Sequence, residues 1–351
     1  AYVGLSLCYL NQALVTFALA GWIKKRFSTK KLIMGGGLVS SWMARSDLSV
    51  QFQGLVDILV KGEGEGPLLN LMGAGNQKKR HFIPDYDFSL HDNYLSPGRV
   101  LPFRASIGCY WSKCRFCPEK AESRPYASLR PSKVMDDLNA IDHAYSPDYV
   151  HFIDNAITPA FLRRLSNARP GFKWYGFVRF EKDLLDPGFC QNLKESGCVM
   201  LKLGLESGDQ DVLDKMNKGT HLDMAGQILA NLNSAGIMTF VYLLFGTWFE
   251  TRDSAVKTLN YVKMHQHHVN YLNLAVFNLP RFCEDAAGLD TCEFYHGDLS
   301  LYLNFKHPYG WDRRHVKQFL DKTFKRALTQ ANIRKTPAFF SSNHAAFFPF
   351  Q

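Results

Sequence analysis

Three of the eight cysteines in this chain of 351 residues lie within nine consecutive positions, at Cys109, Cys114 and Cys117. Four residues separate the first pair and two separate the second pair. Eight cysteines are too few for a disulfide scaffold of this size, and crowding of this kind is typical of metal binding. Three thiolates in a short loop can hold three irons of a cubane iron–sulfur cluster and leave the fourth iron open. The spacing therefore predicts a metal site of the open, catalytic kind.

Structural zinc is the alternative interpretation of the same cysteines. A closed zinc site needs a fourth Cys or His ligand. The next candidates along the chain are His143 and His151, which lie beyond the compact spacing of a zinc knuckle. We therefore expect an iron–sulfur cluster and keep zinc as the alternative.

The cysteine loop follows the first of six apolar segments that we predict to be strands. These are Val100–Ser106, Tyr149–Ile153, Trp174–Phe180, Val199–Gly204, Met238–Leu244 and Tyr271–Phe277. Predicted helices lie between them, at Ser132–His143, Pro159–Asn167, Pro187–Ser196, Asp209–Met216, Leu222–Ala235 and Arg252–His265, with Ser132 and Thr251 at N-cap positions. Strands that alternate with helices predict a parallel sheet with right-handed crossovers, either open or barrel-like. Active sites of such folds gather at the carboxyl ends of the strands, where the cysteine loop also lies.

Polar and glycine residues stand at the ends of the other predicted strands. They are Asp154, Arg179, Glu206 with Ser207, and Gly246. Each has a structural alternative: a turn residue, an interior cation, a helix cap or a tight turn. Because all of them share one rim with the cysteine loop, we predict that they contact a cofactor there.

This set of residues resembles the radical S-adenosylmethionine (radical SAM) superfamily over residues 100–280. The cysteine loop carries the resemblance, with the aromatic Phe116 just before its last cysteine. So do Leu203–Gly208, followed by Asp209 to Gly219, and the glycine-then-glutamate turn within Leu244–Thr251. The commonest spacing in that family has one residue fewer between the first two cysteines than the four found here.

The resemblance implies that the three cysteines hold a 4Fe–4S cluster whose free iron binds S-adenosylmethionine. In that family one electron from the cluster cleaves this cofactor to a 5′-deoxyadenosyl radical. The residues implied to contact S-adenosylmethionine are Phe116 near the adenine, Asp154, Arg179, Glu206, Ser207 and Gly246.

Residues 1–73 predict a separate α/β unit. The pattern indicates strands at Tyr2–Leu7, Lys31–Met34 and Leu55–Val60, with a helix over Asn11–Arg26. The second and third strands run into the glycine-rich stretches 35–37 and 62–66. Glycines at such positions let the backbone approach a ligand closely.

This unit resembles the later part of a cobalamin-binding domain, and the residues so implied are Ser6, Gly35, Gly36, Gly62 and Glu63. The fold class is therefore α/β: a partial (βα)6 radical SAM barrel, preceded by a partial Rossmann-like cobalamin-binding domain. The earlier strand, which often carries an Asp-x-His-x-x-Gly motif, is missing. Either the unit is truncated, or it binds cobalamin without a protein histidine, or it is degenerate. The sequence begins with Ala rather than Met, so we expect it to be part of a longer protein.

Two further regions complete the predicted organisation. Residues 74–99 are polar and rich in turn residues, which indicates a linker. Residues 281–351 form a C-terminal helical and aromatic extension, with one helix over Trp311–Ala331. Its aromatic end, which includes Ser341 to His344, either covers the active-site cleft or completes the core.

Composition limits the classes of protein to consider. Hydrophobic residues make up 46% and charged residues 21%, as in a folded globular protein. The net charge is +9, but there is no long basic run and no recognisable RNA-binding appendage, so we expect no nucleic-acid partner. No segment reaches the roughly 18–20 apolar residues that cross a bilayer, so we expect no membrane association.

The predicted function is that of a radical SAM enzyme that methylates an unactivated carbon with the help of cobalamin. The alternatives are a radical SAM enzyme without cobalamin, acting in RNA modification or rearrangement, and a non-catalytic iron–sulfur or zinc module. The expected partners are a small-molecule or peptide substrate and a reductant such as flavodoxin or ferredoxin. The cluster is oxygen-sensitive in this family, so a reducing cytoplasm is the expected location.

Overall fold

The computed structural model describes residues 1–44, 51–74, 83–87, 96–294, 299–329 and 338–347. Most of the predicted linker and the last two residues of the helix predicted over Trp311–Ala331 lie outside the described residues. No helix among the residues described is long and apolar enough to cross a membrane.

A parallel sheet of seven strands forms the centre of the molecule, in the order β15-β11-β10-β9-β8-β7-β4. Six of them match the predicted strands: β4 (Val100–Phe103), β7 (Tyr149–Phe152), β8 (Lys173–Val178), β9 (Cys198–Glu206), β10 (Met238–Phe245) and β11 (Tyr271–Val276). The seventh, β15 (Ala338–Phe339), was not predicted. It is two residues long, and its pairing with β11 comes from a distant tertiary contact that no local pattern reveals.

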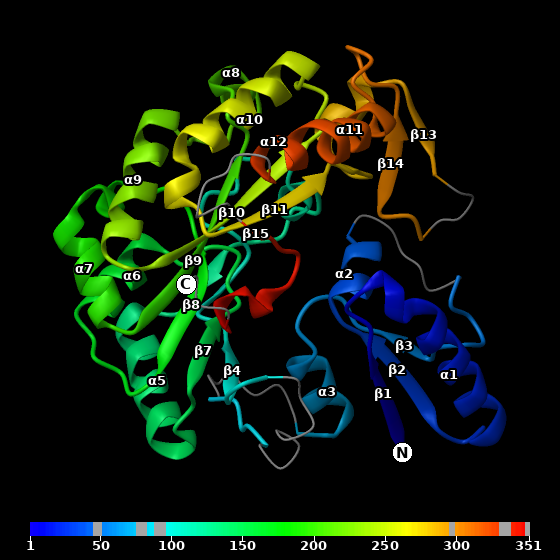
Figure 1. Ribbon diagram of the computed structural model, residues 1–351. Coiled ribbons are helices and arrows are strands. Elements are labelled where there is room, and N and C mark those ends of the chain that lie inside the picture. Colours follow the sequence, from blue (N-terminus) through cyan, green and yellow to red (C-terminus); the bar gives the residue numbers. More distant parts are fainter. Residues whose placement is uncertain (45–50, 75–82, 88–95, 295–298, 330–337, 348–351) are drawn as a thin grey trace.

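Helices cover one face of this sheet (Figure 1). They are α5 (Pro131–Tyr145), α6 (Pro159–Ser166), α7 (Pro187–Glu195), α9 (Leu222–Ser234) and α10 (Arg252–His265), with α8 (Gln210–Lys215) at the carboxyl edge. The predicted cap at Thr251 is confirmed, because its side chain accepts a hydrogen bond from the Ser254 N–H. The predicted cap at Ser132 is wrong: α5 begins at Pro131, since proline favours the first helical position, where no N–H is needed.

The opposite face of the sheet turns towards the N-terminal region in Figure 1, and among the described residues the helix that packs on it is the short 3₁₀ helix η7 (Asn343–Phe347). Tyr175, Met200 and Phe240 are buried there against Ala345 and Ala346 near the end of the described chain. The aromatic C-terminal segment therefore packs against the sheet, as in the second of the two alternatives, in which it completes the core.

The N-terminal region forms a second, smaller parallel sheet in the order β1-β2-β3. Its elements are β1 (Tyr2–Ser6), α1 (Ala13–Arg26), β2 (Lys31–Gly35), α2 (Gly37–Trp42), β3 (Ile58–Leu59) and α3 (Glu65–Leu71). Its core is separate from that of the large sheet and includes Leu7, Leu32 and Met34. Gly36 has a φ of +105°, and a Cβ there would lie 2.5 Å from the Leu7 carbonyl oxygen, so only glycine fits this turn.

The C-terminal region differs from the prediction of a helix followed by aromatic residues. It contains a small antiparallel sheet of β12 (Leu279–Pro280), β14 (Tyr302–Phe305) and β13 (Thr291–Glu293). The predicted helix is interrupted: α11 (Arg313–Phe319) passes through a π-helical stretch at Leu320–Phe324 into α12 (Lys325–Thr329). Leu299 and Leu301 pack on the N-terminal core, and the Trp42 indole N–H donates to the Leu299 carbonyl at 2.7 Å.

Short 3₁₀ helices complete the described structure. They are η1 (Leu10–Gln12), η3 (Lys182–Leu185), η4 (Gln266–His268), η5 (Glu284–Gly288) and η7 (Asn343–Phe347).

Candidate active site

The cysteine loop leaves the carboxyl end of β4 and is closed at its base by a short antiparallel ladder. This ladder pairs β5 (Ser106–Ile107) with β6 (Ala127–Ser128). Gly108 turns the chain into the loop with a φ of +71°, and a Cβ there would lie 2.9 Å from the Pro125 carbonyl. The helix α4 (Pro118–Ala121) begins directly after Cys117. All three cysteines therefore lie on one loop that is fixed at both ends.

Asp154 holds the start of this loop. Its carboxylate accepts a hydrogen bond from the Ala105 N–H at 3.1 Å and one from the Ser106 hydroxyl at 2.5 Å. Burial raises the pKa of Asp154, and these hydrogen bonds oppose the rise. Since both carboxylate oxygens bind the base of the loop, the structure gives Asp154 a positioning role there.

The turn after α8 forms a cradle for the other side of the loop. The Arg115 N–H donates to the Met216 carbonyl at 2.9 Å, and the Trp111 indole N–H donates to the Asn217 carbonyl at 3.0 Å. The Trp111 ring lies on Gly219, where a Cβ would be 2.5 Å from Cη2 of the ring. Gly219 has a φ of +68°, so both its backbone and its contact with the ring require glycine.

Two buried cations lie beside the loop. The Arg179 guanidinium is 4.3 Å from the centre of the Trp111 ring and donates to the Lys218 carbonyl. The Lys218 ammonium donates to Glu206 at 2.7 Å and lies 5.6 Å from the centre of the Phe116 ring. Glu206 itself has a φ of +68°, a conformation that strains a residue with a side chain. The predicted residues Phe116, Arg179 and Glu206 are thus brought together at the cysteine loop.

The environment of the cysteines fits a set of thiolates on a cluster. All three are free thiols. Burial raises the pKa of Cys114, and the charges of Lys218 and Arg179 oppose the rise. Burial raises the pKa of Cys117 to about 11, while N–H groups of Lys120 and Glu119 stabilise its thiolate. Buried cations and helical N–H groups are the partners that anionic sulfur needs in an apolar site.

The spacing of these ligands also bears on the zinc alternative. Among the residues described, no three His, Cys, Asp or Glu side chains are close enough to bind a single metal ion. A cubane cluster puts its cysteine sulfurs on different irons, so it needs them further apart than one zinc ion does. Among the described residues, the three cysteines therefore do not form a preorganised single-metal site.

Ser207 and Gly246 have structural contacts that follow the alternative interpretation. The Ser207 hydroxyl is fully buried, lies 3.3 Å from the Thr258 hydroxyl of α10 and accepts from the Asp209 N–H at 3.1 Å. Gly246 has a φ of +84°, and a Cβ there would lie 3.1 Å from Val316 of α11. Ser207 and Gly246 therefore contact α10 and α11, the helices that pack beside the strand ends.

Several residues at this site were missed by the sequence analysis. Lys218 and Gly219 lie in the segment that carried the family resemblance, so that segment was the available signal. On the outer side of the loop, the Arg115 guanidinium forms a two-pronged ion pair with Asp285, and the Cys283 thiol donates to the Arg115 carbonyl at 3.4 Å. No local pattern links residues so far apart in the sequence.

The predicted cobalamin residues share one edge of the small sheet. Ser6 and Gly35 are register partners at the carboxyl ends of β1 and β2. The Ser40 hydroxyl, which was not predicted, donates to the Gly36 carbonyl at 2.9 Å and accepts from the Gly62 N–H at 2.9 Å. Ser40 thus ties the two glycine turns together. In parallel α/β sheets, ligands usually bind at the edge where the loops leave the carboxyl ends of the strands.

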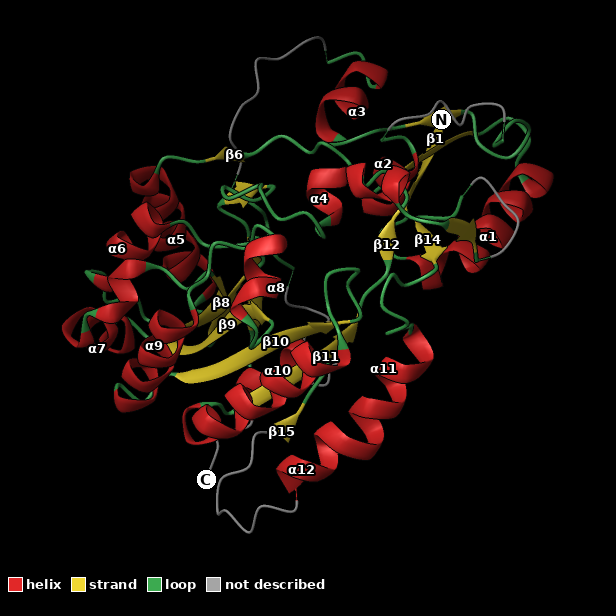
Figure 2. Cartoon of the chain, turned by 90° about the horizontal axis from the view of Figure 1, so that it is seen from above, coloured by secondary structure: helices red, strands yellow, loops and turns green. Residues whose placement is uncertain are grey.

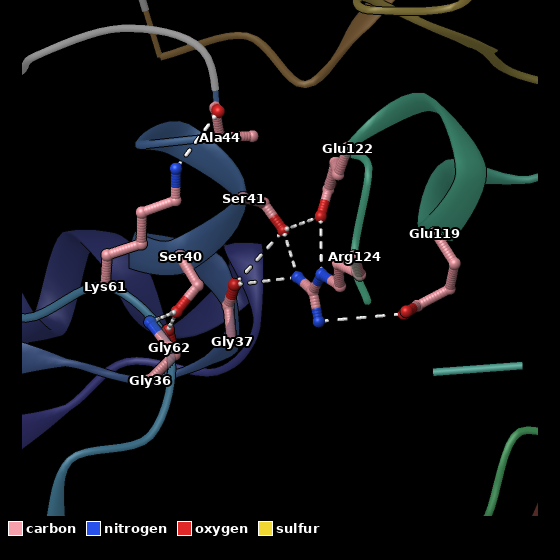
Figure 3. A network of polar contacts seen from close by, with 10 residues as sticks. All are labelled: Gly36, Gly37, Ser40, Ser41, Ala44, Lys61, Gly62, Glu119, Glu122 and Arg124. Carbon is pink, nitrogen blue, oxygen red and sulfur yellow. Dashed lines mark hydrogen bonds and ion pairs between the residues drawn. The ribbon is translucent and has the colours of Figure 1, made fainter. Parts of the chain in front are cut away.

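Polar contacts join this edge to the cysteine loop (Figure 3). Arg124 donates to the Ser41 hydroxyl at 2.8 Å and to the Gly37 carbonyl at 3.4 Å. It also pairs with Glu122 at 2.8 Å, and Ser41 donates to the same carboxylate at 3.1 Å. We call Ser41, Glu122 and Arg124 the interdomain latch. Figure 2 shows α2 beside α4, the short helix that starts at the last cysteine.

A second contact links the predicted cobalamin edge to the cysteine loop. Glu63 lies 3.6 Å from the guanidinium of Arg104, which directly follows β4 and precedes the loop. The two predicted cofactor sites therefore face one another across bridging contacts at two places.

No protein-family model matches the chain. It is 24% identical over 225 residues to bacteriochlorophyllide d C-12(1)-methyltransferase of Chlorobaculum tepidum, covering 61% of this chain and 48% of the relative. It is 22% identical over 244 residues to an uncharacterized methyltransferase of Pyrococcus horikoshii, covering 63% and 52%. It is 23% identical over 246 residues to anaerobic magnesium-protoporphyrin IX monomethyl ester cyclase of Rubrivivax gelatinosus, covering 58% and 44%. The chain thus spans about half the length of the curated relatives it matches.

Solved structures share the fold. OxsB, a cobalamin-dependent S-adenosylmethionine radical enzyme with aqua-cobalamin and S-adenosylmethionine bound, superposes with a TM-score of 0.67 at 14% identity, covering 95% of this chain and 61% of OxsB. The radical S-adenosylmethionine methyltransferase TsrM from Kitasatospora setae gives 0.64 at 16% identity, covering 84% and 68%. The fold is a mixed α/β fold with a parallel sheet, similar to that of these radical SAM enzymes. The resemblance predicted from the cysteine loop and from the N-terminal unit is confirmed.

Proposed function

We propose that this chain is the catalytic part of a cobalamin-dependent radical SAM methyltransferase that acts on an unactivated carbon. Its substrate is a small molecule or peptide, and its electrons come from a reductant such as flavodoxin or ferredoxin. The observation that carries the proposal is the placement of the cysteine loop opposite the glycine turns of the N-terminal sheet. The Arg104–Glu63 ion pair and the interdomain latch join the two. The methyltransferases among the relatives support it.

Cys109, Cys114 and Cys117 would hold the 4Fe–4S cluster in a partial (βα)6 barrel. When bound, the cofactors would supply an electron, a cleavable S–C bond and a transferable methyl group. The chain's own residues do the positioning. Asp154 fixes the base of the loop, the cradle at Met216 to Gly219 fixes its far side, and Lys218 offsets negative charge at Cys114.

On the opposite side, Ser6, Gly35, Gly36, Gly62 and Glu63 would contact cobalamin. Gly36 lets its turn pack closely against the Leu7 backbone, and Ser40 ties the two glycine turns together. Glu63 pairs with Arg104, the residue that leads into the cysteine loop.

Anaerobic reconstitution followed by a titration with hydroxocobalamin tests the proposal. The protein is loaded with iron and sulfide, its iron and sulfide are counted, and hydroxocobalamin is then titrated in by absorption. We expect a full 4Fe–4S cluster and saturable cobalamin binding. A Cys109/Cys114/Cys117→Ala variant should lose the cluster, whereas the matched control Cys8→Ala/Cys292→Ala should keep it, because both of those cysteines are exposed and outside the loop.

The second candidate is a radical SAM enzyme that acts without cobalamin, in RNA modification or in a rearrangement. The same titration separates the two. A full cluster with no saturable binding of hydroxocobalamin would support the second candidate, and a protein that binds zinc but assembles no cluster would refute both.

A further inference from the structure

Arg115 lies in the short spacer between two cysteines of the loop, next to Cys114 and two positions before Cys117. Both polar groups of its backbone are bound by other segments. Its N–H donates to the Met216 carbonyl at 2.9 Å, and its carbonyl accepts a hydrogen bond from the Cys283 thiol at 3.4 Å. Burial raises the pKa of Cys283, so the thiol keeps the proton that it donates at neutral pH. The spacer is therefore held by two separate segments, the turn after α8 and the C-terminal region.

The side chain of Arg115 is bound as completely as its backbone. Its Nε and Nη2 donate to the two carboxylate oxygens of Asp285, the first at 2.9 Å. Its Nη1 donates to the Lys215 carbonyl at 3.2 Å, and the guanidinium lies 4.6 Å from the centre of the Phe249 ring. Two parallel N–H groups match a carboxylate in geometry as well as in charge, so such a pair is stronger and more directional than a single contact. Asp285 therefore fixes the direction in which the Arg115 side chain leaves the loop.

Asp285 belongs to a short segment of the C-terminal region that lies against the cysteine loop. We call residues 283–285 the strap. It follows β12 of the small antiparallel sheet, and Cys283 is the N-cap of η5. The Cys283 side chain is buried in an apolar cluster with Ala121 of α4, and Phe116 packs against that cluster. The strap thus contacts the loop on both sides of its last cysteine.

Glu284, the middle residue of the strap, forms a weaker contact with the same loop. Its carboxylate lies 3.5 Å from the Lys120 ammonium of α4, and its side chain is 77% exposed. The Asp285 side chain is 22% exposed and that of Arg115 is 37% exposed. Single exposed ion pairs contribute little to stability, whereas two-pronged arginine–carboxylate pairs are the exception. Of the two acidic residues in the strap, Asp285 therefore carries the ion pair that matters for the loop.

We propose that Asp285 is a positioning residue for the cluster site and acts through Arg115 on Cys114 and Cys117. A spacer that is held at an N–H, a carbonyl and a side chain has restricted backbone torsions, and these torsions set the directions in which the two cysteine side chains leave it. Arg115 and Asp285 are 170 positions apart, so the C-terminal region becomes part of the cluster site. That the two cysteines bind a cluster rests on the proposed function.

Release of iron to a chelator tests the proposal. Wild-type and variant proteins are reconstituted anaerobically, and the loss of cluster absorption under excess chelator is followed without S-adenosylmethionine or reductant. Asp285→Asn keeps the shape of the side chain but turns an amide N–H₂ towards the guanidinium, so we expect it to release iron roughly tenfold faster. Glu284→Gln is the matched control and should release iron within about twofold of the wild-type rate.

Two further readouts separate positioning from general stability. The electron paramagnetic resonance spectrum of the dithionite-reduced cluster reports its geometry, and it should shift in Asp285→Asn but not in Glu284→Gln. The double variant Arg115→Asp/Asp285→Arg restores an ion pair with the charges exchanged, so it should release iron more slowly than Arg115→Asp alone. If Asp285→Asn does not fold, two variants of Cys283 take its place. Cys283→Ala removes the donor to the Arg115 carbonyl and should speed iron release, whereas Cys283→Ser keeps a donor and should not.

The outcomes that would overturn the proposal are specific to the strap. One is iron release from Asp285→Asn at the wild-type rate, or at the same raised rate as from Glu284→Gln. Another is a double variant that loses iron no more slowly than Arg115→Asp alone. A wild-type protein that assembles no cluster would refute the proposed function and this inference with it, so the two failures are distinguishable.

Discussion

Gly219→Ala tests whether the cradle at Met216 to Gly219 holds the cysteine loop. Gly219 has a φ of +68°, and an added Cβ would lie 2.5 Å from Cη2 of Trp111 and closer still to Cζ2. The left-handed backbone alone costs roughly 1–2 kcal/mol for a residue with a side chain. The ring must also move away, which endangers its hydrogen bond to Asn217 and its contact with Arg179.

The magnitude of the second effect follows from these two contacts. The hydrogen bond is worth about 0.5–1.5 kcal/mol and the cation–π contact about 0.5–1 kcal/mol. Loss of both weakens loop docking by about 1–2.5 kcal/mol, and each 1.4 kcal/mol is roughly a tenfold change in an equilibrium constant. We therefore expect Gly219→Ala to lower cluster retention by roughly 5- to 60-fold under limiting chelator.

Gly310→Ala is the matched control. Gly310 has a φ of +67°, nearly that of Gly219, but nothing lies within 4 Å of its added Cβ. It therefore carries the backbone strain without the clash. The assay is iron content and melting temperature of both variants after the same challenge with chelator. If Gly219→Ala keeps as much iron as Gly310→Ala and melts at the same temperature, the cradle is not what holds the loop.

Three further predictions follow from buried polar contacts. Asp154→Asn places an amide N–H₂ against donors at the base of the loop, so we expect a loss of about 1–3 kcal/mol in loop docking and a lower iron content on reconstitution; full iron loading would contradict this role. Burial raises the pKa of Glu250 from 4.5 to about 7, so its folded state holds a proton that the unfolded state releases as pH rises from 4.5 to 7. The protonated Glu250 therefore contributes about 3 kcal/mol to the free energy of unfolding below pH 4.5, and this contribution is lost as the pH rises to 7. Urea titrations at pH 5 and 8 measure this pH dependence, and Glu250→Gln should reduce it. An unchanged pH dependence of the free energy of unfolding would refute the assignment. Arg124→Gln removes the centre of the interdomain latch and should weaken hydroxocobalamin binding roughly 5- to 30-fold. Arg169→Gln should not weaken it, because that arginine contacts Glu195 and the carbonyls of Ser166 and Ala168 instead; equal affinities of the two variants would count against the latch.

The sequence predicted the elements whose signals are local. The six apolar segments between helical patterns became β4 and β7 to β11, because strand and helix periodicities are properties of short windows. The cysteine loop was placed at the carboxyl end of the first of these strands for the same reason. The cap at Thr251 also depends only on its neighbours.

Contacts between distant segments could not be predicted. The cradle joins Trp111 and Arg115 to residues about a hundred positions later, and the Arg115–Asp285 pair spans more. β15 is a strand because it pairs with the edge of β11, far away in the sequence. α5 starts at Pro131, one residue before the serine that we predicted as its N-cap. Lys202 interrupts an apolar strand segment in the sequence, which was a visible anomaly, but its pairing with His151 required the fold.

Formation of 5′-deoxyadenosine tests the central claim most directly. The reconstituted protein is mixed anaerobically with dithionite and S-adenosylmethionine, and the product is measured by mass spectrometry. The account predicts 5′-deoxyadenosine from wild type and from Cys8→Ala/Cys292→Ala, and none from the Cys109/Cys114/Cys117→Ala variant. A folded wild-type protein that carries a full cluster and forms no 5′-deoxyadenosine would contradict the assignment of this loop to radical SAM chemistry.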